Sequence, residues 1–145
     1  MTAPLDVSVS RVMQAPPDRI RRIMFDPMQD PGWMAAVKSV EPIDTHDEPG
    51  ARVRRIGRFL GRPLRWTTEL IAKTPSQLDL RIIDGPMRGT VTYSIEPAGS
   101  GSQVTIRNTG DAPGFAPRTL LLMWAMRRSL NADLRRLQRV VEDRA

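Results

Sequence analysis

Histidine is the side chain most often used for proton transfer near neutral pH, and this sequence contains one, His46. It lies in the polar stretch 44–48, where Asp44, Asp47 and Glu48 are close in sequence. A histidine beside carboxylates could act as a general base, but a lone loop histidine is more often a solvated surface residue. One histidine with loop carboxylates is also a weak ligand set for a metal. His46 is therefore a catalytic candidate, and we expect no metal and no cofactor.

Polar side chains on strands are a second source of acid–base chemistry. A cyclase needs only a few inward groups to orient an enolate and move protons. Glu69, Arg81, Tyr93 and Asn108 fall within strand-like segments. Most polar residues of an antiparallel sheet face water, so Glu69 and Tyr93 join His46 as catalytic candidates only if they point inward. No cysteine is present, which excludes a thiolate nucleophile.

Large apolar side chains suggest the binding of an apolar molecule. The chain has eight methionines and three tryptophans. Methionine adapts to irregular apolar shapes, and tryptophan adds one N–H that can orient a ligand. The same residues could instead fill a closed core. The ligand-binding candidates are Trp33, Phe59, Trp66, Met87, Tyr93, Phe115, Leu120, Met123 and Trp124.

Strand alternation predicts which of these side chains point inward. Trp66 shares a strand face with Thr68, and Arg55 shares one with Phe59, because successive side chains alternate between faces. We expect Phe59, Trp66 and Tyr93 to face the interior. A register error of one residue would reverse this assignment.

The charge of the chain is basic, +6 from 22 basic and 16 acidic residues. Arg52, Arg54 and Arg58 crowd the outward face of one predicted strand. Such a face could contact anionic lipid weakly or remain simply solvated. We do not expect nucleic acid as a partner, because no exposed aromatic residues for base stacking accompany these arginines.

The length predicts one domain over residues 1–145. The N-terminal residues lack the basic start and apolar run of a signal peptide. The longest apolar run, Leu120–Met126, falls far short of the ~20 residues that a membrane span needs. We therefore expect a cytoplasmic protein.

The elements that would position these residues follow from alternation and turn signals. A strand over Leu5–Met13 precedes a helix that begins near Ala15 and a short helical or irregular piece, 28–34. Six further strands separated by Gly/Pro-rich turns form an antiparallel meander. They cover Val37–Ile43, Ala51–Leu60, Leu64–Lys73, Leu78–Ile83, Thr90–Glu96 and Gln103–Asn108. We expect Gly110–Pro117 to be a shaped loop that leads into the last helix.

The last helix, predicted over Arg118–Asp143, has two unlike halves. The first, Thr119–Met126, is apolar nearly all round, which predicts that a concave sheet covers it on several sides. The second is amphipathic. Its apolar stripe consists of Leu130, Leu134, Leu137 and Val141. Any exposed part of the first half could instead be a dimer contact, so monomer and homodimer both remain open.

In this arrangement the chain resembles the START-like helix-grip superfamily, also called Bet v 1-like or SRPBCC. The resemblance lies in its bacterial polyketide cyclase/dehydrase and lipid-transport branch. It covers nearly the whole chain and depends on the order of several short pieces. These are residues 15–20, Asp26-Pro27 with Trp33, Pro49–Val53, Trp66–Glu69, Gly89–Pro97, Gly101–Thr105 and the C-terminal leucine stripe.

The resemblance implies an α+β helix-grip fold. In it, a seven-stranded curved antiparallel sheet, with two short helices after its first strand, wraps around the long C-terminal helix. It also implies a cavity for lipids, polyketides or other apolar molecules, but it does not imply a reaction. The sequence therefore favours binding or transport of a hydrophobic small molecule or lipid. The alternative is a polyketide cyclase/dehydratase that uses the same cavity.

Overall fold

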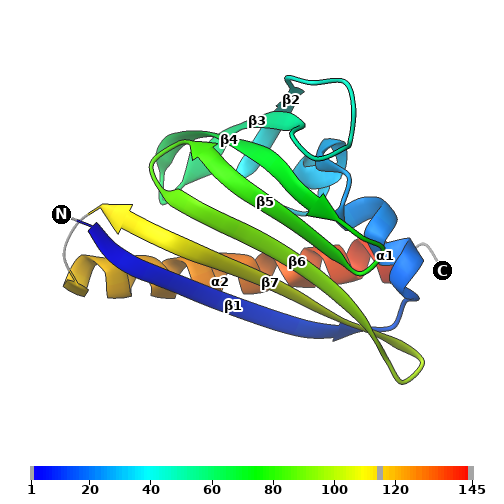
Figure 1. The fold of residues 1–145 in the computed structure, drawn as a ribbon. Helices are drawn as coiled ribbons and strands as arrows, with labels where there is room; N and C mark the ends of the chain where they lie inside the picture. The colour runs from blue at the N-terminus through cyan, green and yellow to red at the C-terminus, as the bar shows by residue number, and fades with distance from the viewer. Residues whose placement is uncertain (1, 114–115, 144–145) are drawn as a thin grey trace.

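The computed structural model describes residues 2–113 and 116–143. The elements run in the order β1 (Thr2–Met13), α1 (Pro17–Met24), the 3-10 helix η1 (Pro27–Gly32), β2 (Val37–Pro42), β3 (Arg52–Phe59), β4 (Arg62–Lys73), β5 (Gln77–Asp84), β6 (Arg88–Ala98), β7 (Gly101–Pro113) and α2 (Ala116–Glu142). The strands form one 7-stranded antiparallel sheet in the order β1-β7-β6-β5-β4-β3-β2. The sheet curves over α2 (Figure 1). This arrangement confirms the predicted helix-grip fold.

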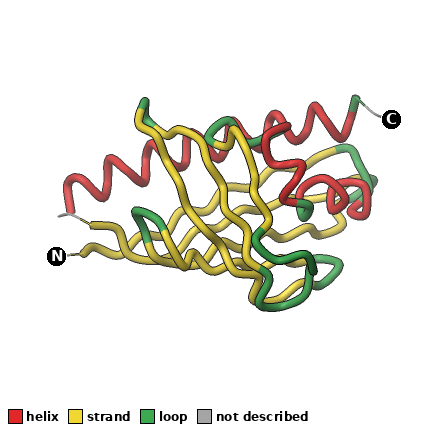
Figure 2. Tube along the Cα trace, turned by 90° about the horizontal axis from the view of Figure 1, so that it is seen from above, coloured by secondary structure: helices red, strands yellow, loops and turns green. Residues whose placement is uncertain are grey.

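The short helices cluster at one end of the sheet. Seen from above, α2 extends along the sheet, and α1 and η1 lie near its C-terminal end (Figure 2). Pro17 begins α1, where no backbone N–H is needed, and Ile20 and Ile23 are buried. The side chain of Asp26 caps η1 by accepting a hydrogen bond from the Met28 N–H at 3.0 Å.

Two facing glycines let β6 and β7 pair closely. Gly89 and Gly110 are partners in the register, with φ of 156° and 155°. A Cβ on Gly89 would lie 1.9 Å from the Thr109 carbonyl oxygen, and one on Gly110 would lie 2.0 Å from that of Arg88. Since only glycine tolerates both the conformation and the contact, these positions fix the local path of the sheet.

Strand β7 is longer than the sequence predicted. Part of the predicted loop Gly110–Pro117 belongs to the sheet, because β7 continues to Pro113 and pairs with β1 up to Thr2. The prediction was wrong because pairing with β1, and with β6 as far as Asp111, satisfies backbone groups that the Gly/Pro-rich sequence suggests are free.

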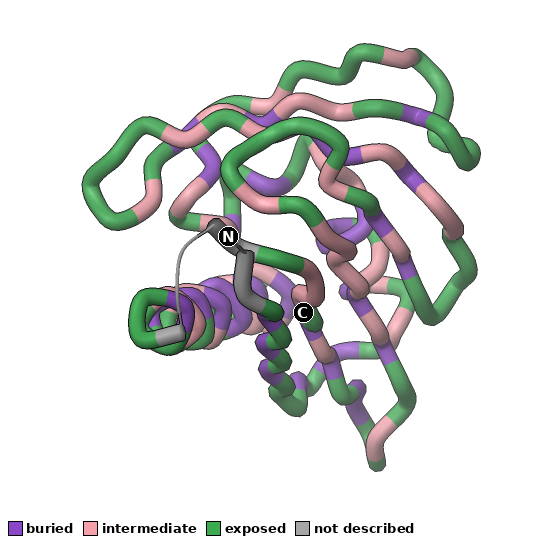
Figure 3. Tube along the Cα trace, turned by 60° about the vertical axis from the view of Figure 1, so that its left-hand side comes forward, coloured by how far each residue is buried: buried purple, intermediate pink, exposed green. Residues whose placement is uncertain are grey.

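The first half of α2 is also less covered than predicted. Leu134, Leu137 and Val141 are fully buried, whereas Leu120 and Leu121 are 64% and 67% exposed. Figure 3 shows the exposed start of this helix and the buried positions farther along it. The prediction that a concave sheet covers the apolar half on several sides was wrong, since a single sheet covers one side of a helix.

Neither α1 nor α2 has the length and hydropathy that a membrane-crossing segment requires. This finding concerns the helices in the described part of the chain.

Candidate functional site

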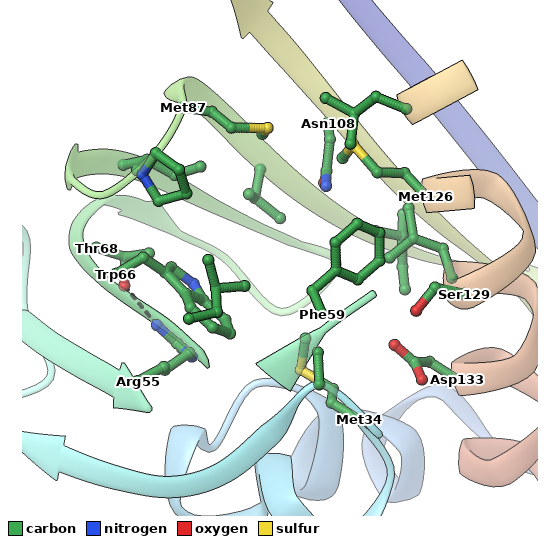
Figure 4. A pocket seen from close by; sticks show the side chains of 18 of the residues that line it. Met34, Arg55, Phe59, Trp66, Thr68, Met87, Asn108, Met126, Ser129 and Asp133 are labelled. Carbon is green, nitrogen blue, oxygen red and sulfur yellow. Dashed lines mark hydrogen bonds between the residues drawn. The ribbon is translucent and has the colours of Figure 1, made fainter. Parts of the chain in front are cut away.

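A cavity of about 470 Å³ lies between the sheet and α2. Its walls come from strands β3 to β7, from the segment after η1 and from the middle of α2. Apolar side chains dominate them, among them Met34, Phe59, Leu80, Met87 and Met126. In the close-up view, Phe59 and Met126 lie beside the cavity near Ser129 and Asp133 (Figure 4). A mostly apolar concave site with a few polar groups is typical of small-molecule binding.

A buried ion pair forms one polar part of the wall. Arg55 on β3 donates from Nε to Asp30 Oδ2 of η1 at 2.6 Å and from Nη1 to Thr68 Oγ1 at 2.6 Å. Arg55 and Asp30 are only 4% and 1% exposed. Burial raises the pKa of Asp30, although the charge of Arg55 opposes that rise. Arg55 lines the cavity, so a guanidinium held by two hydrogen bonds is available to a ligand.

Asp133 on α2 provides a second polar group. Its Oδ1 accepts hydrogen bonds from the Ala35 N–H at 3.2 Å and from Arg136 Nη1 at 2.7 Å. Burial nevertheless raises the pKa of Asp133 to about 6, because desolvation outweighs these bonds. A carboxyl group with this pKa can exchange a proton near neutral pH, and Asp133 lines the cavity.

Tyr93 on β6 lies deep in the cavity wall. Its ring meets Trp33 edge-on, with centroids 6.0 Å apart, and lies 6.4 Å from the ring of Phe25. The hydroxyl is 4.0 Å from Met34 Sδ, and burial raises the pKa of Tyr93 well above its usual value. The Tyr93 hydroxyl therefore stays protonated at neutral pH and can serve as a hydrogen-bond donor.

Two buried polar atoms lack a hydrogen-bond partner among the described residues, Asn108 Oδ1 and Trp33 Nε1. Asn108 on β7 lines the cavity, and its side chain points into it (Figure 4). A buried amide without a partner costs free energy, which a bound hydroxyl or N–H could offset. Asn108 is therefore a candidate for contacting a polar group of a ligand.

Four of the predicted ligand-binding residues line the cavity: Phe59, Trp66, Met87 and Tyr93. They lie on β3, on β4, before β6 and on β6, and converge from segments far apart in the sequence. The inward orientation of Phe59, Trp66 and Tyr93 follows the predicted strand faces.

The other predicted ligand-binding residues lie elsewhere. Trp33 is 1% exposed and packs behind Tyr93, and Met123 is half-buried beside the core. Leu120 is exposed, and Trp124 borders a second hollow beside the main cavity. Phe115 lies outside the described residues. Thus Trp33, Leu120, Met123 and Trp124 are not among the residues that line the main cavity.

Two of the three predicted catalytic residues lie away from the cavity. His46 is on an exposed loop, where its Nδ1 accepts a hydrogen bond from the Glu48 N–H at 3.3 Å. Glu69 pairs with Arg81 at 3.6 Å and is not among the lining residues. Only Tyr93 of the three reaches the cavity. No cluster of metal-ligating side chains is found in residues 2–113 and 116–143.

Asp30, Asp133 and Ser129 were not candidates from the sequence. The sequence predicts that Arg55 shares the inward strand face with Phe59 but indicates no role for it. Its position among apolar neighbours on that face was the available signal for a buried charge. Asp133 similarly interrupts the apolar stripe between Leu130 and Leu134, where a carboxylate is unusual.

Comparisons with known proteins agree with this geometry. The model of a family described as polyketide cyclase / dehydrase and lipid transport matches residues 4–142. A search of curated proteins found no significant match.

Solved structures share the fold at low sequence identity. TTHA0849 from Thermus thermophilus superposes with a TM-score of 0.83 at 22% identity, covering 97% of this chain and 99% of that one. A START superfamily protein from Mycobacterium smegmatis superposes with a TM-score of 0.82 at 16% sequence identity, covering 97% of this chain and 99% of that one. The Zhui aromatase/cyclase from Streptomyces sp. R1128 superposes with a TM-score of 0.80 at 14% sequence identity, covering 99% of this chain and 96% of that one.

Proposed function

Since the chain belongs to the polyketide cyclase/dehydrase and lipid-transport family, we propose that its cavity binds a hydrophobic small molecule or lipid. The observation that carries this proposal is the cavity of about 470 Å³, whose lining is largely apolar. Binding would remove apolar surface from water on both the ligand and the protein, which is the main source of affinity in such sites.

The polar groups of the cavity favour a ligand that is not a pure hydrocarbon. Arg55 offers a cationic donor, Tyr93 a neutral hydroxyl and Asn108 an acceptor without a partner among the described residues. An apolar group packed against them would leave their remaining hydrogen-bonding capacity unmet, which costs free energy. The ligand class that fits best is therefore an apolar molecule with a few oxygen atoms.

Leu121 and Leu122 provide a matched test of cavity binding. Leu122 lines the cavity, whereas its neighbour Leu121 is 67% exposed on the outside of α2. We expect an uncharged naphthylamine probe to bind saturably to the native chain. Leu122→Trp, which fills part of the cavity, should weaken probe binding at least about fivefold, or about 1 kcal/mol. Leu121→Trp should bind the probe like the native chain. Equal effects of the two substitutions, or no saturable binding, would reject the proposal.

An enzyme that uses the same cavity, of the polyketide cyclase/dehydratase type, is the second candidate. The raised pKa of Asp133, about 6, favours it, because this carboxyl could donate or accept a proton at the cavity wall. With a linear poly-β-ketone as substrate, followed by mass spectrometry, Asp133→Asn should slow product formation and leave probe affinity unchanged. Unchanged turnover in this variant would exclude Asp133 as the proton-transfer group.

A further inference from the structure

We propose that the mouth of the cavity docks onto an anionic phospholipid surface. The docking surface is an apolar rim, defined as Leu60, Leu120, Leu121 and Trp124, together with the arginines beside it. The proposal goes beyond ligand binding, because it names the surface on which the cavity opens. It shares with the proposed function only the position of the cavity.

The rim consists of large apolar side chains that are 57–67% exposed. Trp124 shares a face of α2 with Leu120 and Leu121, since it follows them by four and three residues. Leu60 lies at the tip of the β3–β4 hairpin, across a hollow that both Leu60 and Trp124 line. Leu60 also lines the main cavity, so the rim adjoins the cavity at Leu60. Exposed apolar residues that are gathered in this way mark an interaction surface more often than scattered ones do.

The backbone of Leu60 adds independent support. Its φ is 53°, and it is the one non-glycine residue with positive φ in the described part of the chain. Leucine is disfavoured there by the contact of Cβ with the backbone, and glycine or asparagine would fit at lower cost. A strained and 67% exposed leucine at a hairpin tip is unfavourable for the folded chain alone. A partner that buries the side chain would account for it.

The arginines beside the rim identify the partner by charge. Arg58 and Arg128 line the hollow with Leu60 and Trp124, and Arg62 follows the hairpin tip. Arg128 lies over the Trp124 ring at 5.6 Å. No carboxylate is paired with Arg58, Arg62 or Arg128 within the part of the chain that the structure describes. A surface that combines exposed apolar side chains, a tryptophan and unpaired arginines is complementary to a bilayer with anionic headgroups.

A second copy of the chain fits this surface less well. A symmetric dimer through the rim would bring the same arginines of two copies together, and like charges at an interface oppose association. The net charge of +6 adds long-range repulsion between copies and long-range attraction to an anionic membrane. The charge pattern therefore favours a lipid surface over self-association.

The test is co-sedimentation of the full chain with vesicles, without any added cavity ligand. One vesicle type is pure phosphatidylcholine, and the other is a mixture of equal amounts of phosphatidylcholine and phosphatidylglycerol. We expect binding to the anionic vesicles, weaker binding to the neutral ones, and a loss of binding as salt rises from about 0.05 M to about 0.5 M. Absence of binding to anionic vesicles would overturn the proposal, and the cavity probe assay would still report separately on the proposed function.

Matched variants separate the rim from general effects. Leu60→Ser with Trp124→Ser should reduce vesicle binding by about tenfold, because less apolar area enters the interface. Val12→Ser with Met28→Ser removes side chains of similar exposure, 51% and 56%, outside the rim and should have little effect. Equal losses in the two variants would show that the rim is not the docking surface.

Two triple variants that lose the same positive charge test the electrostatic part of the docking proposal. Replacing Arg58, Arg62 and Arg128 with glutamine should weaken binding more than replacing Arg22, Arg81 and Arg107, which pair with carboxylates. Equal weakening would mean that net charge alone drives binding.

Light scattering completes the test, since a dimer that dissociates on Leu60→Ser would make the rim a self-interface and overturn the proposal. Thermal melts test whether every variant is folded. If the double variant Leu60→Ser with Trp124→Ser unfolds, the single variant Leu121→Ser takes its place.

Discussion

The two halves of α2 are both rich in leucine but have opposite environments. In the C-terminal half, Leu134, Leu137 and Val141 are fully buried in the core. In the N-terminal half, Leu121 and Trp124 stay more than half exposed. The difference arises from what surrounds each half, because apolar composition alone does not bury a side chain. The C-terminal half stabilises the fold, and the N-terminal half contributes Leu122 and Met126 to the cavity wall while its other face stays exposed.

The same contrast holds for arginines on β3. Arg55 is buried, faces the cavity and pairs with Asp30, whereas Arg58 is exposed beside the hairpin tip. The positions differ by three residues and so lie on opposite faces of the strand. The molecule therefore has a closed end, where charges are paired, and an open end, where charges and apolar groups face outward.

The largest expected effect comes from Arg55→Met at the closed end. Removing the guanidinium leaves the Asp30 carboxylate buried without its partner, which should lower the free energy of unfolding by about 3–5 kcal/mol. Urea denaturation followed by circular dichroism measures it. Arg58→Met is the matched control and should change stability by less than about 0.5 kcal/mol. Equal changes would remove the distinction between the two ends.

The second effect is on the two halves of α2. Leu134→Ala leaves a cavity in a fully buried region and should cost about 2–5 kcal/mol. Leu121→Ala removes a side chain that is mostly in water and should cost less than about 0.5 kcal/mol. The same denaturation experiment measures both. A large loss for Leu121→Ala would mean that the N-terminal half is buried in solution, as in a stable dimer.

Much of the fold was predictable, because alternation and Gly/Pro turns identify antiparallel strands and their faces. The inward faces of Phe59, Trp66 and Tyr93 follow from that periodicity, since each strand buries one side. The extension of β7 was not predictable, because its glycines and prolines suggest a loop. It is a strand only because β1 and β6 pair with it.

The candidate site was less predictable than the fold. The Arg55–Asp30 pair joins β3 to the 3-10 helix η1, 25 residues earlier in the sequence, and no local pattern indicates such a tertiary contact. The exposure of the first half of α2 was missed for a related reason. Periodicity shows that a side chain is apolar, but it does not show whether this chain, a ligand or another surface covers it.

The third effect concerns Asp133, near the boundary between the two halves. The pKa of Asp133 in the folded chain, about 6, lies above the ordinary value of 3.8. At a pH between these two values, the folded state therefore binds more protons than the unfolded state. Stability from this group is therefore highest below pH 4 and falls as pH rises toward 6, by at most about 3 kcal/mol. Unfolding titrations should show that Asp133→Asn removes this fall.

The control for this pH effect is Asp6→Asn. Arg107 lowers the pKa of Asp6, so that group adds stability at higher pH and loses it as pH falls. The difference between the native chain and Asp6→Asn should therefore change with pH in the direction opposite to that seen for Asp133→Asn. The same sign for both variants would contradict the burial of Asp133 as the cause.

The smallest expected effect is at the hairpin tip of the open end. Asparagine accepts the left-handed conformation more readily than leucine, so Leu60→Asn should stabilise the chain slightly, by up to about 1 kcal/mol. If the docking proposal holds, the same substitution should weaken binding to anionic vesicles. Thermal melting and co-sedimentation of one preparation measure both quantities. A variant with lower stability would show that Leu60 packs within the fold, and one that gains stability and keeps full vesicle binding would remove Leu60 from the docking surface.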